Sequence, residues 1–485
     1  MASAIEKTIR KTVTSGIMGV SKVSAALKTR SDDHPYLTGI HTPMDEELTL
    51  TELSVDGEIP ADLNGRYLRI GPNPVTPPKP ATYHWFIGDG MAHGLNIKDG
   101  KAQWYRNRWI RSKEVSEALG EPLVPCPEGR ERGNANTNII GQNGRTWAIV
   151  EAGNCPVELN DELETLAVNA FDDTLKGSFS AHPHLDPETG EMHAICYKGD
   201  SMDTIWHTVV GTDGKVIREE PITVEHGPSI HDCAITEHYI VIMDLPVTFS
   251  MKTLISGHPF PYRWNPDHKA RIGLLPRNGS NADVIWHDID PCYAFHPCNA
   301  FENADGAVIM DIAVHNRMFD DSYDGPDGST IAFERWAISA KGDTVARKLI
   351  DETDQEFPRF DERLTGKPYR FAYTMAAENI SDTPGLISDT RLFKHDVEAG
   401  TREVHDFGAK RHPGEFVFTP RGDGEDAKED GGWLVGLVVD MNTDSTDFVI
   451  LDAANFTGDP VATIHLPHRI PPGFHGNWVN AGAAS

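Results

Sequence analysis

The sequence has little of several features that would indicate other classes of protein. Its 44 basic residues are outnumbered by 73 acidic ones, and the formal net charge of −29 argues against a nucleic-acid partner. No apolar run reaches about 18 residues, so no transmembrane helix is expected. The six cysteines form no CxxC pair and are interpreted as buried free thiols, which suit a reducing cytosol. A cytoplasmic protein is therefore predicted.

Helical periodicity is also scarce, with one short candidate at residues 112–119. From about Leu48 onward, short apolar or alternating runs are separated by turn dipeptides such as Asn143-Gly144 and Asp305-Gly306. The runs expected to form strands include residues 66–70, 147–151, 193–197, 239–243, 307–312, 433–439 and 448–452. Regularly spaced short strands over this length favour an all-β fold and, among such folds, a propeller.

The N-terminal segment differs in character from the rest of the chain. Between residues 1 and 30, six lysines and arginines stand against the single acidic residue Glu6, and apolar residues recur at helical spacing. Residues 1–35 are therefore predicted to form a basic amphipathic arm, and residues 36–485 a single propeller domain. The arm is expected either to lie peripherally on a membrane, to be partly ordered, or to pack against the propeller.

No HExxH-type metal motif is present, so a metal site would have to combine separated histidines. Taken alone, each histidine is weak evidence, because most histidines are surface or hydrogen-bonded core residues. Four of them lie in distinctive segments: Ser180–Glu191, Ser229–Thr236, Phe295–Glu302 and Pro471–Trp478. Further distinctive segments are Leu63–Pro74, Phe86–His93, Asn136–Asn138, Glu356–Arg359 and Gly414–Arg421.

Together, and in this order, these segments resemble the carotenoid cleavage oxygenases, from about Glu58 to Trp478. The resemblance implies a seven-bladed β-propeller with iron on its central axis, and loops and short helices that form a cap over one face. It implies that the cofactor is Fe(2+) and that the metal ligands are His182, His231, His296 and His475. His184 is the rival of His182, but the family places this ligand immediately before a proline, which favours His182.

The resemblance also assigns residues around the metal. Glu151, Glu356 and Glu415 match carboxylates that accept the free N–H of a ligand ring, which leaves His182 without a carboxylate partner. Thr137 matches a threonine beside an open iron position. Four neutral imidazoles suit Fe(2+) and leave two octahedral positions open, one of them for O2. The four histidines, together with Glu356 and Glu415, recur every 49–65 residues, in agreement with one position per blade.

The implied reaction is cleavage of a carbon–carbon double bond by O2 to give two carbonyl products. Family members that cleave stilbenes usually carry a lysine before the first glutamate and a tyrosine in an earlier segment. Here Val150 precedes Glu151, and Trp109 lies near the expected tyrosine, so an apolar carotenoid or apocarotenoid is the favoured substrate. The residues expected to line the substrate tunnel are Phe86, Trp109, Val150, Phe301 and Phe319, with Tyr83, Trp85 and Phe249 as further candidates.

Three alternatives remain open at this point. The first is a dioxygenase that cleaves lignostilbene or another hydroxystilbene, for which Tyr105 or Arg108 would supply polarity. The second is a non-catalytic propeller that binds carotenoid, and the third is an isomerase. Four histidines with open metal positions argue against a purely structural metal, because a structural site needs no open position.

Overall fold

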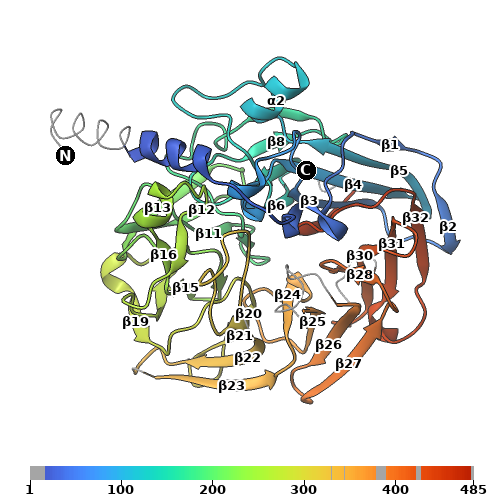
Figure 1. Ribbon diagram of the computed structural model, residues 1–485. Coiled ribbons are helices and arrows are strands. Elements are labelled where there is room, and N and C mark those ends of the chain that lie inside the picture. Colours follow the sequence, from blue (N-terminus) through green and yellow to red (C-terminus); the bar gives the residue numbers. More distant parts are fainter. Residues whose placement is uncertain (1–16, 329, 343, 378–388, 422–427, 482–485) are drawn as a thin grey trace.

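The computed structural model describes residues 17–328, 330–342, 344–377, 389–421 and 428–481. Within these residues, seven antiparallel sheets of four to six strands stand as blades around a central axis (Figure 1). A two-stranded ribbon, β16–β17, accompanies them. The all-β fold and the seven-bladed β-propeller predicted from the sequence are both confirmed.

The blades follow one another in chain order. The strands of the first three blades, with β2, run over Thr49–Leu50 (β1), Ser54–Gly57 (β2), Gly65–Pro72 (β3), Gly90–Lys98 (β4), Lys101–Trp109 (β5), Asn138–Gln142 (β6), Arg145–Ile149 (β7), Val157–Leu159 (β8), Thr165–Val168 (β9), His184–Leu185 (β10), Met192–Cys196 (β11), Thr204–Val210 (β12) and Val216–Thr223 (β13). The next two blades and the ribbon comprise Cys233–Ile235 (β14), Tyr239–Asp244 (β15), Val247–Phe249 (β16), Tyr262–Trp264 (β17), Arg271–Pro276 (β18), Ile285–Asp288 (β19), Pro297–Glu302 (β20), Val308–His315 (β21), Ile331–Ile338 (β22) and Val345–Asp351 (β23). The remaining strands are Gln355–Arg359 (β24), Phe371–Ala376 (β25), Arg391–Asp396 (β26), Thr401–Asp406 (β27), Arg411–Pro413 (β28), Val417–Pro420 (β29), Gly432–Asp440 (β30), Ser445–Asp452 (β31), Ala462–Leu466 (β32) and Gly476–Asn480 (β33).

Helices are few and short. The two α-helices beyond the N-terminal segment are Lys113–Leu119 (α2) and Met251–Ile255 (α3), and the 3-10 turns are Pro35–Leu37 (η1), Gly39–His41 (η2), Pro80–Thr82 (η3), Trp85–Ile87 (η4), Asn281–Asp283 (η5), Glu362–Leu364 (η6) and Ala453–Asn455 (η7). The expected helix at 112–119 forms because the Ser112 side chain accepts a hydrogen bond from the Val115 N–H and caps its first turn. Of the predicted arm, residues 17–27 are helical, and residues 1–16 lie outside the described residues.

The ring is closed by strands from both ends of the chain. The C-terminal β33 pairs with β3, while β2 adds the outer edge of the last blade by pairing with β32. Each end of the chain therefore completes a blade whose other strands come mainly from the opposite end. Closure of this kind covers the faces of the first and last blades, which an open array of blades would leave exposed.

Burial follows from the stacking of blades on both faces. The middle strand β21 is buried at all eight positions, whereas the outer strand β23 is mostly exposed. Because both faces of a middle strand are covered, its sequence is mostly apolar, and the buried Asp311 of β21 is paired with Arg335. The six cysteines are free, and five of them are buried, while Cys126 is partly buried.

The first strands of neighbouring blades contact each other around the axis, as the pairs β14–β20, β20–β24 and β29–β33 show. The innermost strand of each blade is called its first strand here, and the seven are β6, β10, β14, β20, β24, β29 and β33. Each of them starts at a residue that the sequence analysis singled out, or within two residues of one. In ring order these residues are Thr137, His182, His231, His296, Glu356, Glu415 and His475. Parallel strands that start at one end of an axis bring their first residues together, so the fold gathers positions that are far apart in sequence.

Replacing Gly71 with alanine is expected to destabilise the closure. A Cβ at this position of β3 would lie 2.4 Å from the Cα of Gly473, in the loop that leads into β33. Overpacking of this kind costs about 1–3 kcal/mol, so Gly71→Ala should lower the melting temperature measured by calorimetry. The matched control is Gly19→Ala, because an added Cβ there meets nothing within 4 Å. Equal melting temperatures for Gly71→Ala and wild type would show that the closure tolerates the extra methyl group.

Candidate metal centre and substrate cavity

Four buried histidines meet on the propeller axis. His182, His231, His296 and His475 offer ring nitrogens that all lie within 4.8 Å of one another. The ring of His182 lies 4.4–5.0 Å, centroid to centroid, from each of the other three. Local sequence fixes these positions: Pro183 and Pro297 follow two of the histidines, and the Ser180 hydroxyl accepts a hydrogen bond from the His182 N–H.

The donor set fits a divalent metal. The Nε2 atoms of His231 and His296 lie 3.2 Å apart, close to the separation of about 3 Å expected of two nitrogens that bind one metal at about 2.1 Å. The buried Nε2 of His182 has no hydrogen-bond partner among the described residues. Unpaired ring nitrogens directed at one point are costly unless a ligand satisfies them, and neutral imidazoles suit first-row metals such as Fe(2+).

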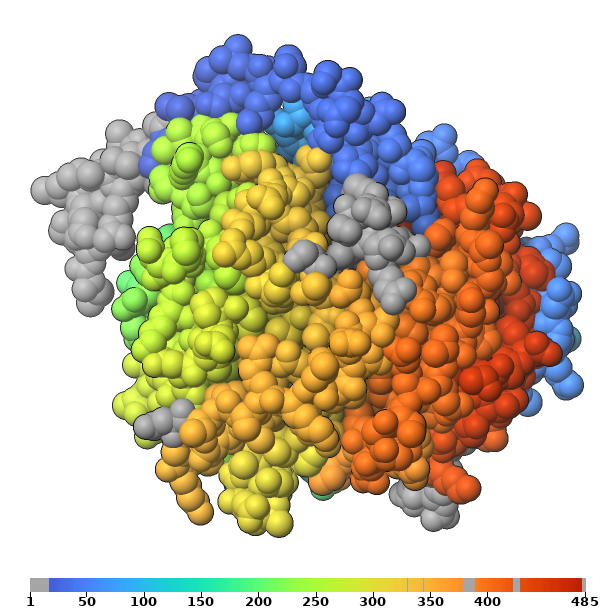
Figure 2. Space-filling view, turned by 60° about the horizontal axis from the view of Figure 1, so that its bottom comes forward, coloured from blue at the N-terminus to red at the C-terminus, as the bar shows by residue number. Residues whose placement is uncertain are grey.

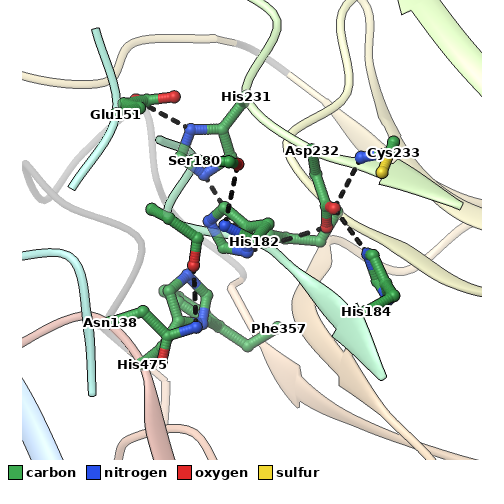
Figure 3. A network of polar contacts seen from close by, with 12 residues as sticks. Asn138, Glu151, Ser180, His182, His184, His231, Asp232, Cys233, Phe357 and His475 are labelled. Atoms are coloured by element: carbon green, nitrogen blue, oxygen red, sulfur yellow. Dashed lines mark hydrogen bonds and ion pairs between the residues drawn. The ribbon is translucent and has the colours of Figure 1, made fainter. Parts of the chain in front are cut away.

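Carboxylates hold three of the rings by their other nitrogen. The Nδ1 atoms of His231, His296 and His475 lie 3.0, 2.7 and 3.0 Å from carboxylate oxygens of Glu151, Glu356 and Glu415, respectively. Figure 3 shows the Glu151–His231 contact. If Nδ1–H donates to the carboxylate, Nε2 is left unprotonated and turned toward the other histidines. The structure therefore brings together the seven residues that the sequence assigned to ligands and ligand partners.

Burial and pairing set the charges of these groups. Burial lowers the pKa of His182 well below its ordinary value, and the neighbouring histidines lower it further. Burial alone would raise the pKa of Glu415, but Arg359 and His475 outweigh it and hold the pKa at about 2. Burial also lowers the pKa of His475, which therefore stays neutral beside an ionised Glu415. Neutral imidazole and ionised carboxylate are the states that bind a metal and orient its ligands.

A strained turn of backbone places Glu356. The residue after it, Phe357, has φ +51° in a β-bulge of β24, a conformation that is rare for an aromatic residue. The Phe357 ring packs against His296 and His475, with centroids 5.3 and 5.2 Å away. Glu356 also accepts a hydrogen bond from His315, 2.9 Å away. The sequence analysis did not identify His315, since no local motif marks it.

An apolar cavity with a volume of about 340 Å³ reaches the centre from one side. His231, His296 and His475 form its inner end, and Thr137 and Val150 lie in its wall. The Thr137 hydroxyl donates a hydrogen bond to Asn136, 3.0 Å away. The outer wall comes from η4 and from the segment that precedes β17, which together form part of a cap over this end of the propeller. Its aromatic lining consists of Trp85, Phe86, Tyr197, Phe249, Phe260, Tyr262, Phe295, Phe357 and Phe474.

The proposed tunnel residues divide into three groups. Phe86 and Val150 line the cavity, as do Trp85 and Phe249. Phe319 does not line it but supports it from behind, because its ring packs on Phe86 and Phe260. Trp109 and Phe301 lie elsewhere: Trp109 packs against Met91 and Val115, and Phe301 packs in the cluster around Cys298 and Phe333.

Two tyrosines in the cavity wall were missed by the sequence analysis. Tyr197 follows β11 and Tyr262 starts β17, and both line the apolar cavity. The Tyr197 hydroxyl lies 3.2 Å from the Ser229 hydroxyl. Tyr105 and Arg108, considered as sources of polarity, do not line the cavity: Tyr105 pairs with His93, and Arg108 pairs with Glu164.

A second cavity, of about 310 Å³, approaches the centre as well. It is more polar than the first, and His182 belongs to its wall together with His184 and Asp232. The imidazole of His184 lies 2.7 Å from an Asp232 carboxylate oxygen (Figure 3). The metal centre therefore stands between an apolar cavity and a more polar one.

Among the described residues, no helix is long and apolar enough to cross a membrane.

Comparison with known proteins agrees with this geometry. The family model described as retinal pigment epithelial membrane protein (RPE65) matches residues 41–480. A carotenoid cleavage oxygenase of Mycobacterium tuberculosis is 41% identical over 92% of this chain and 97% of its own length. Among solved structures, a lignostilbene dioxygenase of Pseudomonas brassicacearum has a TM-score of 0.83 at 27% identity, covering 93% of this chain and 100% of that one. A variant of the Synechocystis apocarotenoid oxygenase has a TM-score of 0.80 at 27% identity, with coverage of 93% and 100%.

The family match covers nearly the whole propeller, including the four histidines and the three glutamates. The 41% identical relative extends over almost the same length. The chain therefore belongs to the RPE65 family of carotenoid cleavage oxygenases.

Proposed function

We propose that this protein is an Fe(2+)-dependent dioxygenase that cleaves a carbon–carbon double bond of a carotenoid or apocarotenoid. One O2 is consumed, and one oxygen atom enters each of the two carbonyl products. The observation that carries this proposal is the position of the four imidazoles, three of which form the inner end of an apolar cavity. A polyene has no polar group along its length, so a site for it has to recognise shape and apolar surface.

The residues of the site have separable tasks in this reaction. His182, His231, His296 and His475 would hold the iron, which when bound supplies the binding and activation of O2 that the apolar substrate itself cannot provide. Glu151, Glu356 and Glu415 keep the ring N–H on Nδ1 and so aim three of the Nε2 atoms at the centre. The aromatic wall would orient the polyene beside the metal and exclude water from it.

The runner-up substrate is a hydroxystilbene. The similarity to a lignostilbene dioxygenase and the two tyrosines in the cavity wall favour it, because phenolic hydroxyls could pair with Tyr197 or Tyr262. Against it stands Val150, which puts an apolar side chain where the stilbene-cleaving members carry a lysine. The 41% identity to a carotenoid cleavage oxygenase supports the polyene instead.

We also propose that the N-terminal helix contacts a membrane from which an apolar substrate is drawn. The helix is docked on the propeller: Lys79 donates to the carbonyls of Ala25 and Ala26, and Arg30 pairs with Asp324. Its outer side exposes Val20, Val23 and Leu27, which are 52%, 61% and 77% exposed and share one helical face. In Figure 2 this segment, in blue, lies across yellow-green and yellow parts of the propeller.

Apolar side chains are also exposed on the cap. Met251 and Ile255 of α3 are 45% and 37% exposed, and Ile87 of η4, which lines the substrate cavity, is 40% exposed. The loop after α3 touches the N-terminal helix, because a Cβ on Gly257 would lie 2.4 Å from the Ala25 nitrogen. An apolar surface next to an apolar cavity suits a lipid layer as the source of substrate.

Substrate choice can be measured directly on the Fe(2+)-loaded protein. An apocarotenal in detergent micelles should give two carbonyl fragments by mass spectrometry, because the cavity is apolar and aromatic. A hydroxylated stilbene in a parallel sample should remain intact. Benzaldehyde-type fragments from the stilbene alone would reverse the assignment, and an isomer without added oxygen would indicate isomerisation.

Replacing Glu356 with glutamine should weaken metal binding. The change removes the negative charge that pairs with His296 and His315, and loss of such a partner typically costs 10–100-fold in metal affinity. Iron content after dialysis against a chelator measures the effect. The control is Glu334→Gln, since Glu334 pairs with Arg347 on an outer strand pair, away from the centre. Equal iron retention by the Glu356→Gln variant and wild type would contradict the role given to Glu356.

Membrane contact can be tested with the double variant Val23→Asp, Leu27→Asp. Full burial of an apolar side chain of this size contributes about 1.5–3 kcal/mol, so the variant should co-sediment with anionic liposomes at least about tenfold more weakly. Leu349→Asp is the control, because Leu349 is 51% exposed on the outer strand β23. Unchanged co-sedimentation of the double variant would remove the helix from this role.

A further inference from the structure

The remaining ligand, His182, faces a carboxylate that is not one of the three glutamates. Asp232 directly follows the ligand His231 in the chain and is 3% exposed. Its Oδ1 lies 2.7 Å from the His184 Nε2 and accepts a hydrogen bond from the Cys233 N–H at 2.6 Å. Its other oxygen, Oδ2, lies 3.7 Å from the His182 Nδ1. Figure 3 shows Asp232 between the two imidazoles.

The two oxygens of Asp232 are not equivalent. Oδ1 already has two donors, so it is fixed in direction by His184 and the backbone. Oδ2 is left for His182, and a buried carboxylate oxygen gains most when a donor reaches it. The separation of 3.7 Å exceeds a hydrogen bond, and a shift of the His182 ring by about 1 Å would bring it within the usual range.

We propose that Asp232 is the carboxylate partner of His182, and that His184 positions Asp232 for this role. The proposal rests on the iron site proposed above. It gives every one of the four ligands a carboxylate at Nδ1, three from glutamates and one from an aspartate. It also gives His184 a task other than that of a rival ligand, because its Nε2 is engaged by Asp232.

The longer contact has a consequence for the ligand set. The other three rings lie 2.7–3.0 Å from their carboxylates, whereas His182 lies 3.7 Å from Asp232. Asp232 and His184 line the second cavity, as do Glu415 and His475. His182 is therefore the ligand with the longest carboxylate contact, and its ring has the most freedom to turn.

The chain contains a matched control pair. Asp244 is fully buried on β15 and lies 2.9 Å from the His268 Nε2, so it repeats the aspartate–imidazole contact away from the four histidines. Asp244→Asn and Asp232→Asn thus make the same chemical change in similar burial, and Asp244→Asn also removes the charge that pairs with Arg271. A loss that is only structural would affect both variants, whereas a loss of ligand orientation would affect Asp232→Asn alone.

The experiment measures binding of Fe(2+) against a competing chelator and, separately, the visible absorption spectrum after loading with Co(2+). Asp232→Asn should bind Fe(2+) about 10–100-fold more weakly than wild type and show altered Co(2+) bands, since the bands report ligand geometry. Asp244→Asn should retain wild-type affinity and bands. His184→Leu should reproduce the Asp232→Asn change in part, and His184→Gln, which keeps a donor toward Asp232, should restore it.

Each outcome bears on a distinct claim. Wild-type affinity and bands in both Asp232→Asn and His184→Leu would overturn the positioning role. Equal losses in Asp232→Asn and Asp244→Asn would overturn it as well, because the effect would be one of folding. If Asp232→Asn fails to fold, the comparison of His184→Leu with His184→Gln still tests the proposal, because His184 is partly exposed. Failure of wild type to bind Fe(2+) would instead overturn the iron site.

Discussion

The site depends on one geometric constraint: the innermost strands of all seven blades begin at the same end of the propeller axis. Thr137, His182, His231, His296, Glu356, Glu415 and His475 all stand at or next to the start of such a strand. Residues separated by up to several hundred positions become neighbours because each blade contributes its first residue to the same axis. The closing pairs β3–β33 and β2–β32 maintain this geometry, since without them the first and last blades would be free to separate.

Gathering these residues on an axis buries carboxylates, and hydrogen-bond donors and cations beside them offset the loss of hydration. Glu356 and Glu415 are fully or almost fully buried, and isolated buried carboxylates would be expensive. Each is balanced by more than one donor: Glu356 by His296, His315 and the Phe357 N–H, and Glu415 by His475, Arg359 and the Gly476 N–H. The strained backbone at Phe357 belongs to this arrangement, because it turns a backbone N–H back onto Glu356 and leaves the aromatic ring against two ligands.

The sequence was informative where function is carried by short local motifs and uninformative where it depends on blade packing. The strands, the turns and the seven blades could be predicted because alternation and turn dipeptides are local signals. The four histidines and three glutamates could be found because each lies in a motif that resembles the family. Trp109 was expected beside the substrate, but it lies in a separate apolar cluster, because an aromatic residue on a strand has no local signal for what covers it.

The residues that sequence reasoning did not find have a common cause. Tyr197, Tyr262, His315 and Asp232 come from three different blades and from the ribbon, and only the packing of these elements brings them to the cavities or the ligands. Asp232 is instructive, since it is adjacent to a ligand and was still overlooked. Neighbours along a strand point to opposite faces, which makes a residue beside a ligand an unpromising partner for that ligand. It faces a different ligand, His182, from the preceding blade.

The two cavities give the centre opposite surroundings along the axis. On one side the wall is aromatic and apolar, which disfavours water and favours an apolar substrate. Three of the ligands line the cavity on this side. On the other side lie Asp232, His184, Arg359 and Glu415, which are charged or polar and belong to the support of the ligands. A divalent cation held by neutral imidazoles keeps its full charge, and that charge is balanced best from the side that does not receive the substrate. Glu415, Arg359 and Asp232 therefore supply charged groups from the side of the second cavity, and among the described residues Glu151 is the one carboxylate in the wall of the apolar cavity.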